Sequence, residues 1–189
     1  MSMAVKDLSL AELPLPCHLV QSFDTSGWPM GESELERKAE QVFVATLRRA
    51  FTKIGEFTVP DNSELEVSLL FTDDTHIQEL NRDFRGRDKA TNVLSFPDTS
   101  FDAEGLEDAA RWGEPLLLGD IAIAKETLIK EAEVQGKSFE DHFCHLLTHG
   151  ILHLMGYDHI DDDDAIKMET LEIEILAKLG INNPYLADD

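Results

Sequence analysis

The chain has 189 residues, of which 42% are hydrophobic and 29% are charged. This length fits one domain with a sizeable core, so we expect a single domain over residues 1–189 with a poorly defined segment at residues 1–30. The formal net charge of −22 argues against nucleic-acid binding unless basic residues are concentrated locally, because negative charge repels a phosphate backbone.

The ends and the cysteines of the sequence indicate a compartment. Residues 1–16 contain two acids and two prolines, and no basic stretch precedes a long apolar run, so we expect no signal peptide. No later segment is long enough to cross a membrane. Cys17 and Cys144 are too few for a disulfide scaffold. We therefore expect a cytoplasmic protein without a membrane partner.

The N-terminal part of the sequence carries few structural signals. Three prolines interrupt residues 1–30, where we expect only a short strand at 18–23. A helix is predicted over 34–54, because Ser33 and Glu36 form a capping-box pattern ahead of apolar residues at helical spacing.

The middle of the sequence alternates between strand and helix patterns. Alternating apolar residues predict a half-buried strand over 64–71, and a short helix follows over 77–84. Further strands are predicted over 92–96 and 116–124, and the near-continuous apolar run of the latter indicates burial on both faces. The acidic stretch 98–114 contains two glycines, and we expect a loop there.

The last third of the sequence is predicted to be helical. One helix is expected over 125–134, and another begins near Ser138, a residue type that suits the position before a helix. The final helix is expected over 163–179. The acidic run 161–164 precedes it, where carboxylates cap the helix and favour its dipole, so we prefer capping to a cation site.

Histidines are concentrated in the helix that follows Ser138. Five of the seven fall in one short stretch, at His142, His145, His149, His153 and His159. On a helix, His145 and His153 would lie about 12 Å apart along the axis, too far to share one metal ion. Residues four apart face each other, so the helical pair is His145 with His149 or His149 with His153.

The residues after His153 decide between these pairs. Gly156 can end the helix in the left-handed conformation, after which the chain turns back through Asp158 to His159. Three imidazoles and one open position are typical of a catalytic zinc site. The spacing H-x-x-x-H-x-x-G-x-x-H therefore predicts one Zn²⁺ per chain, bound by His149, His153 and His159. The alternative is a polar helix face that carries histidines by chance.

Other residues near this motif have more than one interpretation. His145 lies on the ligand stripe, so we expect it to support a ligand, whereas His142 could do so or lie on the surface. Cys144 lies off the stripe and is expected in the core. Asp158 is a further candidate for supporting a ligand or contacting substrate. Asp120 could orient a ligand or close a turn.

The same histidine spacing occurs in metzincin proteases, H-E-x-x-H-x-x-G-x-x-H, where the glutamate is the general base. Gly150 occupies that position in this sequence. Without this carboxylate a protease would lack its proton acceptor, so peptide hydrolysis by that route is not expected.

A second concentration of charge is basic. Four cations fall between Arg82 and Lys89, where Arg82, Arg85 and Arg87 could hold a phosphate through the bidentate guanidinium group. The alternative is a solvated loop whose charges pair with Asp83 and Asp88. The sequence leaves both interpretations open.

These motifs together match a known family. They are NRDFRGRDKATNVLSFP at 81–97, LGDIAIA at 118–124, HLLTHGILHLMGYDH at 145–159 and the acidic helix that contains Met168 and Glu169. With them the chain resembles the YbeY family of zinc-dependent endoribonucleases, which act in bacterial rRNA maturation.

The resemblance implies a zincin-like α+β fold, in which a small mixed sheet packs with helices and the metal-binding histidines lie on a central helix. It also implies cleavage of single-stranded RNA in 16S rRNA processing and ribosome quality control. The family's zinc ligands fall on His149, His153 and His159, and its functionally important arginine falls on Arg85. We therefore expect catalytic roles for Arg85 and His149, with rRNA and the ribosome or its small subunit as partners and no DNA partner.

Two other functions remain open from the sequence. One is a metal-dependent peptide or amide hydrolase, which the histidine spacing supports and Gly150 opposes. The other is a ribosome-assembly factor without enzymatic activity, in which zinc only stabilises the fold.

Overall fold

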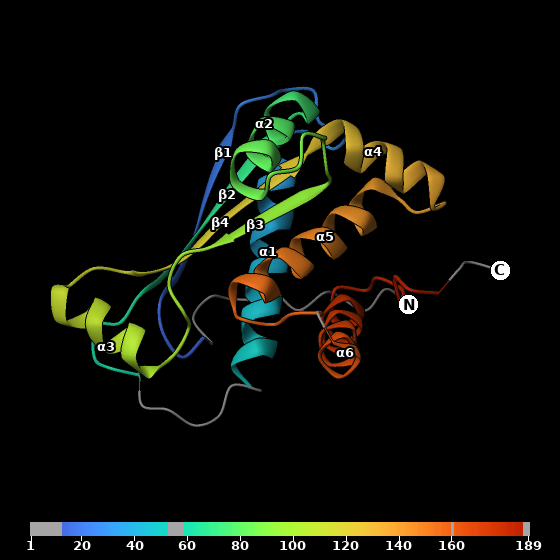
Figure 1. Ribbon diagram of the computed structural model, residues 1–189. Coiled ribbons are helices and arrows are strands. Elements are labelled where there is room, and N and C mark those ends of the chain that lie inside the picture. The colour runs from blue at the N-terminus through green and yellow to red at the C-terminus, as the bar shows by residue number, and fades with distance from the viewer. Residues whose placement is uncertain (1–12, 53–58, 160, 187–189) are drawn as a thin grey trace.

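The computed structural model describes residues 13–52, 59–159 and 161–186. Its elements in chain order are β1 (Cys17–Phe23), α1 (Glu32–Phe51), β2 (Leu65–Thr72), α2 (Asp74–Arg85), β3 (Val93–Pro97), α3 (Ala103–Trp112), β4 (Leu116–Ala124), α4 (Lys125–Val134), α5 (Phe139–Leu154) and α6 (Asp162–Lys178). This small mixed architecture confirms the predicted α+β class (Figure 1).

The sheet has four strands in the order β1-β2-β4-β3. The first three run parallel, and β3 pairs antiparallel with β4, from Val93 opposite Ile123 to Pro97 opposite Gly119. Most of β4 is buried, as its apolar run predicted, although Leu117 and Asp120 are exposed. The antiparallel strand β3 lies at the edge of the sheet, beside the helix that carries the histidines.

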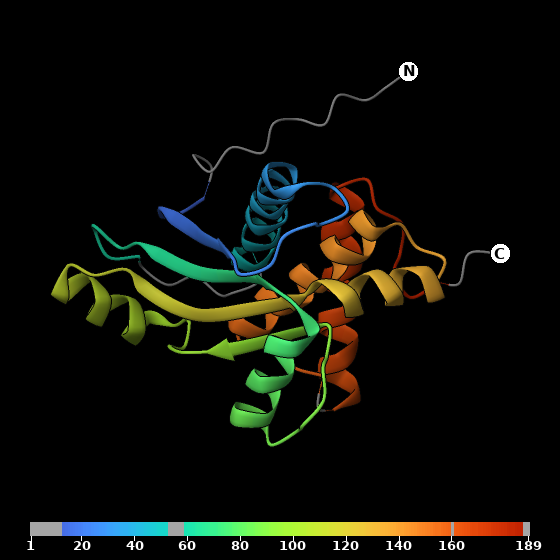
Figure 2. The same cartoon turned by 90° about the horizontal axis from the view of Figure 1, so that it is seen from above.

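Helices cover the two faces of the sheet unequally. The larger layer contains α1 and α5, with α6 packed against both, and α2 lies on the opposite side (Figure 2). Successive residues of β4 show the division, because side chains alternate between faces of a strand. Ile121 lies toward Gly150 of α5, whereas Ala122 packs with Ile77 of α2 in a separate small core. The helix α5, which carries the histidines, is central in the fold, because it contacts the sheet strands β3 and β4 as well as α1, α4 and α6.

The start of α1 differs from the prediction. The helix begins at Glu32 after Gly31, which occupies the cap position without a side-chain hydrogen bond. Ser33 therefore lies inside the first turn, and the predicted capping box is wrong. The predicted end at Ile54 lies outside the described residues.

The stretch 98–114 is also not the predicted loop, because it contains α3. Asp102 caps this helix by accepting a hydrogen bond from the backbone N–H of Gly105, and Gly113 ends it. Leu106 is its one buried residue among the described side chains. A single buried side chain leaves no apolar stripe in the sequence, so the acidic, glycine-containing composition was misleading.

The remaining predicted elements are confirmed, with ends displaced by a few residues. Ser138 and Asp161 cap α5 and α6 through their side chains. Within the predicted poorly defined N-terminal segment, β1 pairs with β2 and Trp28 is buried. Among the described helices, none combines the length and apolar character that a bilayer crossing requires.

Candidate metal centre

The helix α5 positions two of the candidate ligands. Its N-terminus is fixed by Ser138, whose hydroxyl accepts a hydrogen bond from the Asp141 backbone N–H. Buried side chains such as Phe143 and Leu147 pack the helix into the core. His149 and His153, four residues apart, project from the same side near the C-terminal end, as helical geometry requires.

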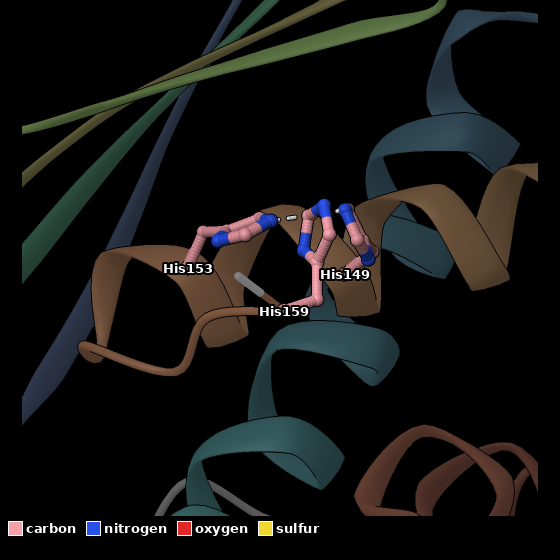
Figure 3. Close-up of side chains that lie close together, drawn as sticks. All are labelled: His149, His153 and His159. Carbon is pink, nitrogen blue, oxygen red and sulfur yellow. Dashed lines mark hydrogen bonds between the residues drawn. The ribbon is translucent and has the colours of Figure 1, made fainter. Parts of the chain in front are cut away.

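The turn after α5 brings in the third histidine. Gly156 has φ of 86°, a left-handed conformation that favours glycine, and the Tyr157 N–H donates to the Leu152 carbonyl at 3.0 Å. The Asp158 carboxylate then accepts a hydrogen bond from the His159 backbone N–H at 2.7 Å. His159 thereby faces the helical pair (Figure 3). One nitrogen from each of the three rings lies within 4.8 Å of the others.

The hydrogen bonds of the two helical rings show which nitrogens are free. His149 Nδ1 lies 2.7 Å from the Glu172 carboxylate, and His153 Nδ1 lies 3.0 Å from the Tyr157 carbonyl oxygen. Both acceptors require an N–H at Nδ1, so in the neutral rings, the form that binds metal, both Nε2 atoms carry lone pairs. These Nε2 atoms are only 3.0 Å apart. Two facing lone pairs repel each other, and a cation between them relieves that repulsion, so the donor set fits a metal ion.

The direction of the pKa shift of His153 agrees with this arrangement. Burial lowers the pKa of His153, and the neighbouring His149 and His159 lower it further. A lowered pKa keeps the ring neutral near pH 7, which is the form that binds metal.

A buried carboxylate that the sequence analysis missed supports His149. Glu172 of α6 has no exposed surface, and it contacts His149, His145 and the hydroxyl of Tyr185. Burial opposes its ionisation, but hydrogen bonds from His145, His149 and Tyr185 lower its pKa to about 2. Its position could have been noticed, because Glu172 follows Leu171 and precedes Ile175 on the apolar stripe of the last helix.

The other two histidines of α5 have different surroundings. His145 Nε2 lies 3.4 Å from Glu172, the carboxylate that also contacts His149, and its supporting role stays a prediction. His142 is buried and pairs with Glu131 of α4 at 2.9 Å. Cys144 is fully buried in the core, as predicted.

Most of the predicted basic residues line the same space as the histidines. A hollow of about 890 Å³ is bordered by His149, His153 and His159, and also by Arg85, Arg87 and Lys89. Arg85 donates to the Ser95 carbonyl at 2.5 Å, and its guanidinium lies 5.6 Å from the centre of the Phe96 ring. Arg82 instead pairs with Asp83 at 2.8 Å and is not among the residues that border the hollow.

The two acidic candidates, Asp158 and Asp120, lie in different places relative to the hollow. Asp158 borders the hollow beside His159. Asp120 lies within β4 with its side chain exposed, on the face opposite Ile121 and α5. It neither closes a turn nor borders the hollow, so both predicted roles for Asp120 are wrong.

Gly150 packs against the sheet strands β3 and β4. A Cβ atom there would lie 3.1 Å from Ser95 Oγ and 3.3 Å from side-chain carbons of Ile121. The position occupied by glutamate in metzincins therefore contacts the sheet here, and the described structure has little space for a longer side chain.

Comparisons with known proteins agree with these motifs. The model of a family described as Endoribonuclease YbeY matches residues 32–180. A protein of Paramagnetospirillum magneticum named Endoribonuclease YbeY is 50% identical over 138 residues, which cover 73% of this chain and 81% of that protein. One of the same name from Sphingopyxis alaskensis is 44% identical over 171 residues, covering 90% and 98%.

A solved structure shares the fold. The solution structure of a Thermotoga maritima protein aligns with a TM-score of 0.51 at 22% identity, covering 90% of this chain and 97% of the other. This likeness supports the α+β architecture alone, and the zincin-like character of the fold stays a prediction.

Proposed function

Because the chain belongs to the Endoribonuclease YbeY family, we propose that it is a metal-dependent endoribonuclease that cleaves single-stranded RNA during 16S rRNA processing and ribosome quality control. The observation that carries the proposal is the hollow in which three histidines and three cations meet. This places potential metal ligands beside groups that can hold phosphate. Ribosomal action in turn suggests a cytoplasmic location and the small subunit as partner.

The proposed metal is one zinc ion per chain, held by His149, His153 and His159. Three nitrogen ligands leave a fourth position open, as in catalytic zinc sites. When bound, Zn²⁺ would supply a Lewis acid that polarises a phosphate oxygen or a water molecule. Glu172 would hold His149 with Nδ1 protonated, so that Nε2 remains available.

The cations of the hollow would bind and orient the RNA backbone. Arg85 is anchored to the Ser95 carbonyl, and such anchoring reduces the conformational freedom lost when it contacts a phosphate. We assign it to stabilising the negative charge that develops on the scissile phosphate. Arg87 and Lys89 would hold neighbouring phosphates.

The proton acceptor is proposed from the composition of the hollow. Asp158 is the one carboxylate among the described residues that border it. One of its oxygens accepts the His159 N–H, which fixes the orientation of the carboxylate. Asp158 therefore is the candidate to accept a proton from the attacking hydroxyl or water.

Parallel assays test the proposal against the two alternatives. Zinc-loaded protein is incubated with labelled single-stranded RNA and with unfolded casein, with and without a chelator. We expect chelator-sensitive RNA fragments and intact casein. Casein cleavage with intact RNA would favour a peptide hydrolase. Binding to ribosomal subunits without cleavage of either substrate would favour an assembly factor.

A further inference from the structure

An aromatic side chain stands exposed one residue before Arg85, which borders the basic hollow. Phe84, in the last turn of α2, has 69% of its surface exposed. Single exposed apolar residues are ordinary on protein surfaces. Phe84, however, packs edge-on against Phe96 of the edge strand β3, with ring centres 5.4 Å apart and planes at 64°. This contact fixes the position of the ring, while most of the side chain stays exposed.

The surroundings of this ring are cationic. Arg85 follows it directly and lies over the same Phe96 ring. After Gly86 ends α2, Arg87 and Lys89 border the hollow together with Arg85. Phe84 and Phe96 do not themselves border the hollow. Arg85 connects them to it, because its guanidinium lies over the Phe96 ring and the same side chain borders the hollow.

We propose that Phe84 is a stacking platform for one RNA base next to the cleaved phosphate. An aromatic ring beside cations is the combination with which proteins bind single-stranded nucleic acids, since bases stack on the ring while the cations follow the backbone. A base can stack there only when it leaves its own helix, so Phe84 contributes to selecting unpaired RNA. The inference rests on the proposed endoribonuclease function and adds a contact outside the metal centre.

The stacking contact also helps to explain how a chain with a net charge of −22 can bind RNA. Long-range electrostatic attraction of RNA to such a chain is weak, so affinity depends on contacts made at short range. Stacking is one such contact, and unlike phosphate binding it depends little on salt. Because Arg85, Arg87 and Lys89 lie nearby, a nucleic acid is favoured over an apolar protein segment as the partner of the exposed Phe84 ring.

The test compares steady-state cleavage of single-stranded RNA by zinc-loaded parent and variants. Phe84→Ala is expected to lower kcat/KM about tenfold, mainly through KM, because base stacking contributes at this level. Phe84→Trp should keep kcat/KM near that of the parent, because tryptophan also offers an aromatic ring for stacking. Val134→Ala removes another exposed apolar side chain, 80% exposed on α4, and should leave cleavage unchanged.

Salt and abasic substrates make the test specific. The defect of Phe84→Ala should persist at high salt, whereas that of Arg87→Ala should shrink. An oligonucleotide with one base removed near the cleavage site should slow the parent but not Phe84→Ala any further, because the contact is already lost.

Different results would reject the stacking role of Phe84 and the proposed endoribonuclease function. If the zinc-loaded parent cleaves no RNA, the proposed function fails. If the parent cleaves RNA and Phe84→Ala equals it on every substrate, the stacking platform is rejected. Normal cleavage of free RNA by Phe84→Ala, with weakened binding to ribosomal subunits, would overturn it in favour of protein docking.

Discussion

At the scale of single residues, the metal centre depends on what holds its ligands. Each ring of the helical pair donates from Nδ1, to the Glu172 carboxylate in one case and to the Tyr157 carbonyl in the other. These contacts select the tautomer that presents Nε2. Tyr185 and His145 in turn hold Glu172, so the C-terminal segment contributes to the centre.

Replacing this carboxylate should weaken metal binding without removing a ligand. Glu172→Gln is expected to lower zinc affinity by about 10- to 100-fold, since contacts that orient ligands contribute at this level. Competition with a coloured chelator measures the affinity. Glu169→Gln on the exposed side of α6 is the matched control and should bind zinc like the parent. Equal affinity in both variants would contradict the orienting role of Glu172.

Arg85 should matter for cleavage and not for metal binding. Arg85→Ala is expected to slow RNA cleavage roughly 100-fold, because an electrostatic contact to the reacting group is lost. Arg85→Lys should restore activity only in part, since an ammonium lacks the bidentate fork. Arg82→Ala is the control, because its guanidinium pairs with Asp83 and does not border the hollow. Parent-like cleavage by Arg85→Ala with zinc fully bound would exclude a catalytic role.

At the scale of elements, the site is assembled by α5, its terminal turn and the connection from α2 to β3. The histidine spacing and Gly156 predicted the first two, because helical periodicity and a helix-ending glycine are local signals. The apolar stripe of the last helix marks Glu172 as a buried position, but the sequence could not identify its partner His149, which is 23 residues away in the chain and on another helix. Likewise, the sequence could not decide which cations pair with acids and which face the histidines.

A glutamate at position 150, where α5 packs against the sheet, should destabilise the protein. Gly150→Glu adds a side chain against Ser95 and Ile121, so it should lower the free energy of unfolding by at least about 1–3 kcal/mol from overpacking. It should also create no efficient casein hydrolysis, because a protease must position its substrate as well, and small misplacements are costly. Urea unfolding and a casein assay measure the two effects, with Gly150→Ala as the milder control. A stable, caseinolytic variant would contradict this orientation of α5.

The contact between α5 and α4 should make stability depend on pH. Burial lowers the pKa of His142 from its ordinary value of 6.5, although Glu131 opposes the shift. The unfolded chain therefore binds more protons at this position, and stability is lost as pH falls below about 6.5. Urea unfolding of zinc-loaded protein should show a smaller loss between neutral and acidic pH in His142→Gln than in the parent. An unchanged pH dependence in His142→Gln would contradict the assignment.

At the scale of the whole molecule, the charge distribution is more informative than its sum. The chain carries 38 acidic and 16 basic residues, yet Arg85, Arg87 and Lys89 border one hollow with the histidines. Acidic residues meanwhile occupy the first turn of every described helix, including α2 and α5, whose C-terminal ends carry the site residues. An acidic protein can thus hold RNA at one place, where contact-range groups act.

Metal binding and RNA cleavage should both depend on the centre formed by the three histidines. The most direct measurement is metal content and cleavage of labelled single-stranded RNA on one preparation of the parent and one of His153→Ala. We expect about one zinc ion per parent chain, because the three imidazoles form one site. The variant should lose most of its zinc and its cleavage together, since two imidazoles bind zinc far more weakly. Full zinc occupancy in His153→Ala, or parent-level cleavage after its zinc is lost, would contradict the account.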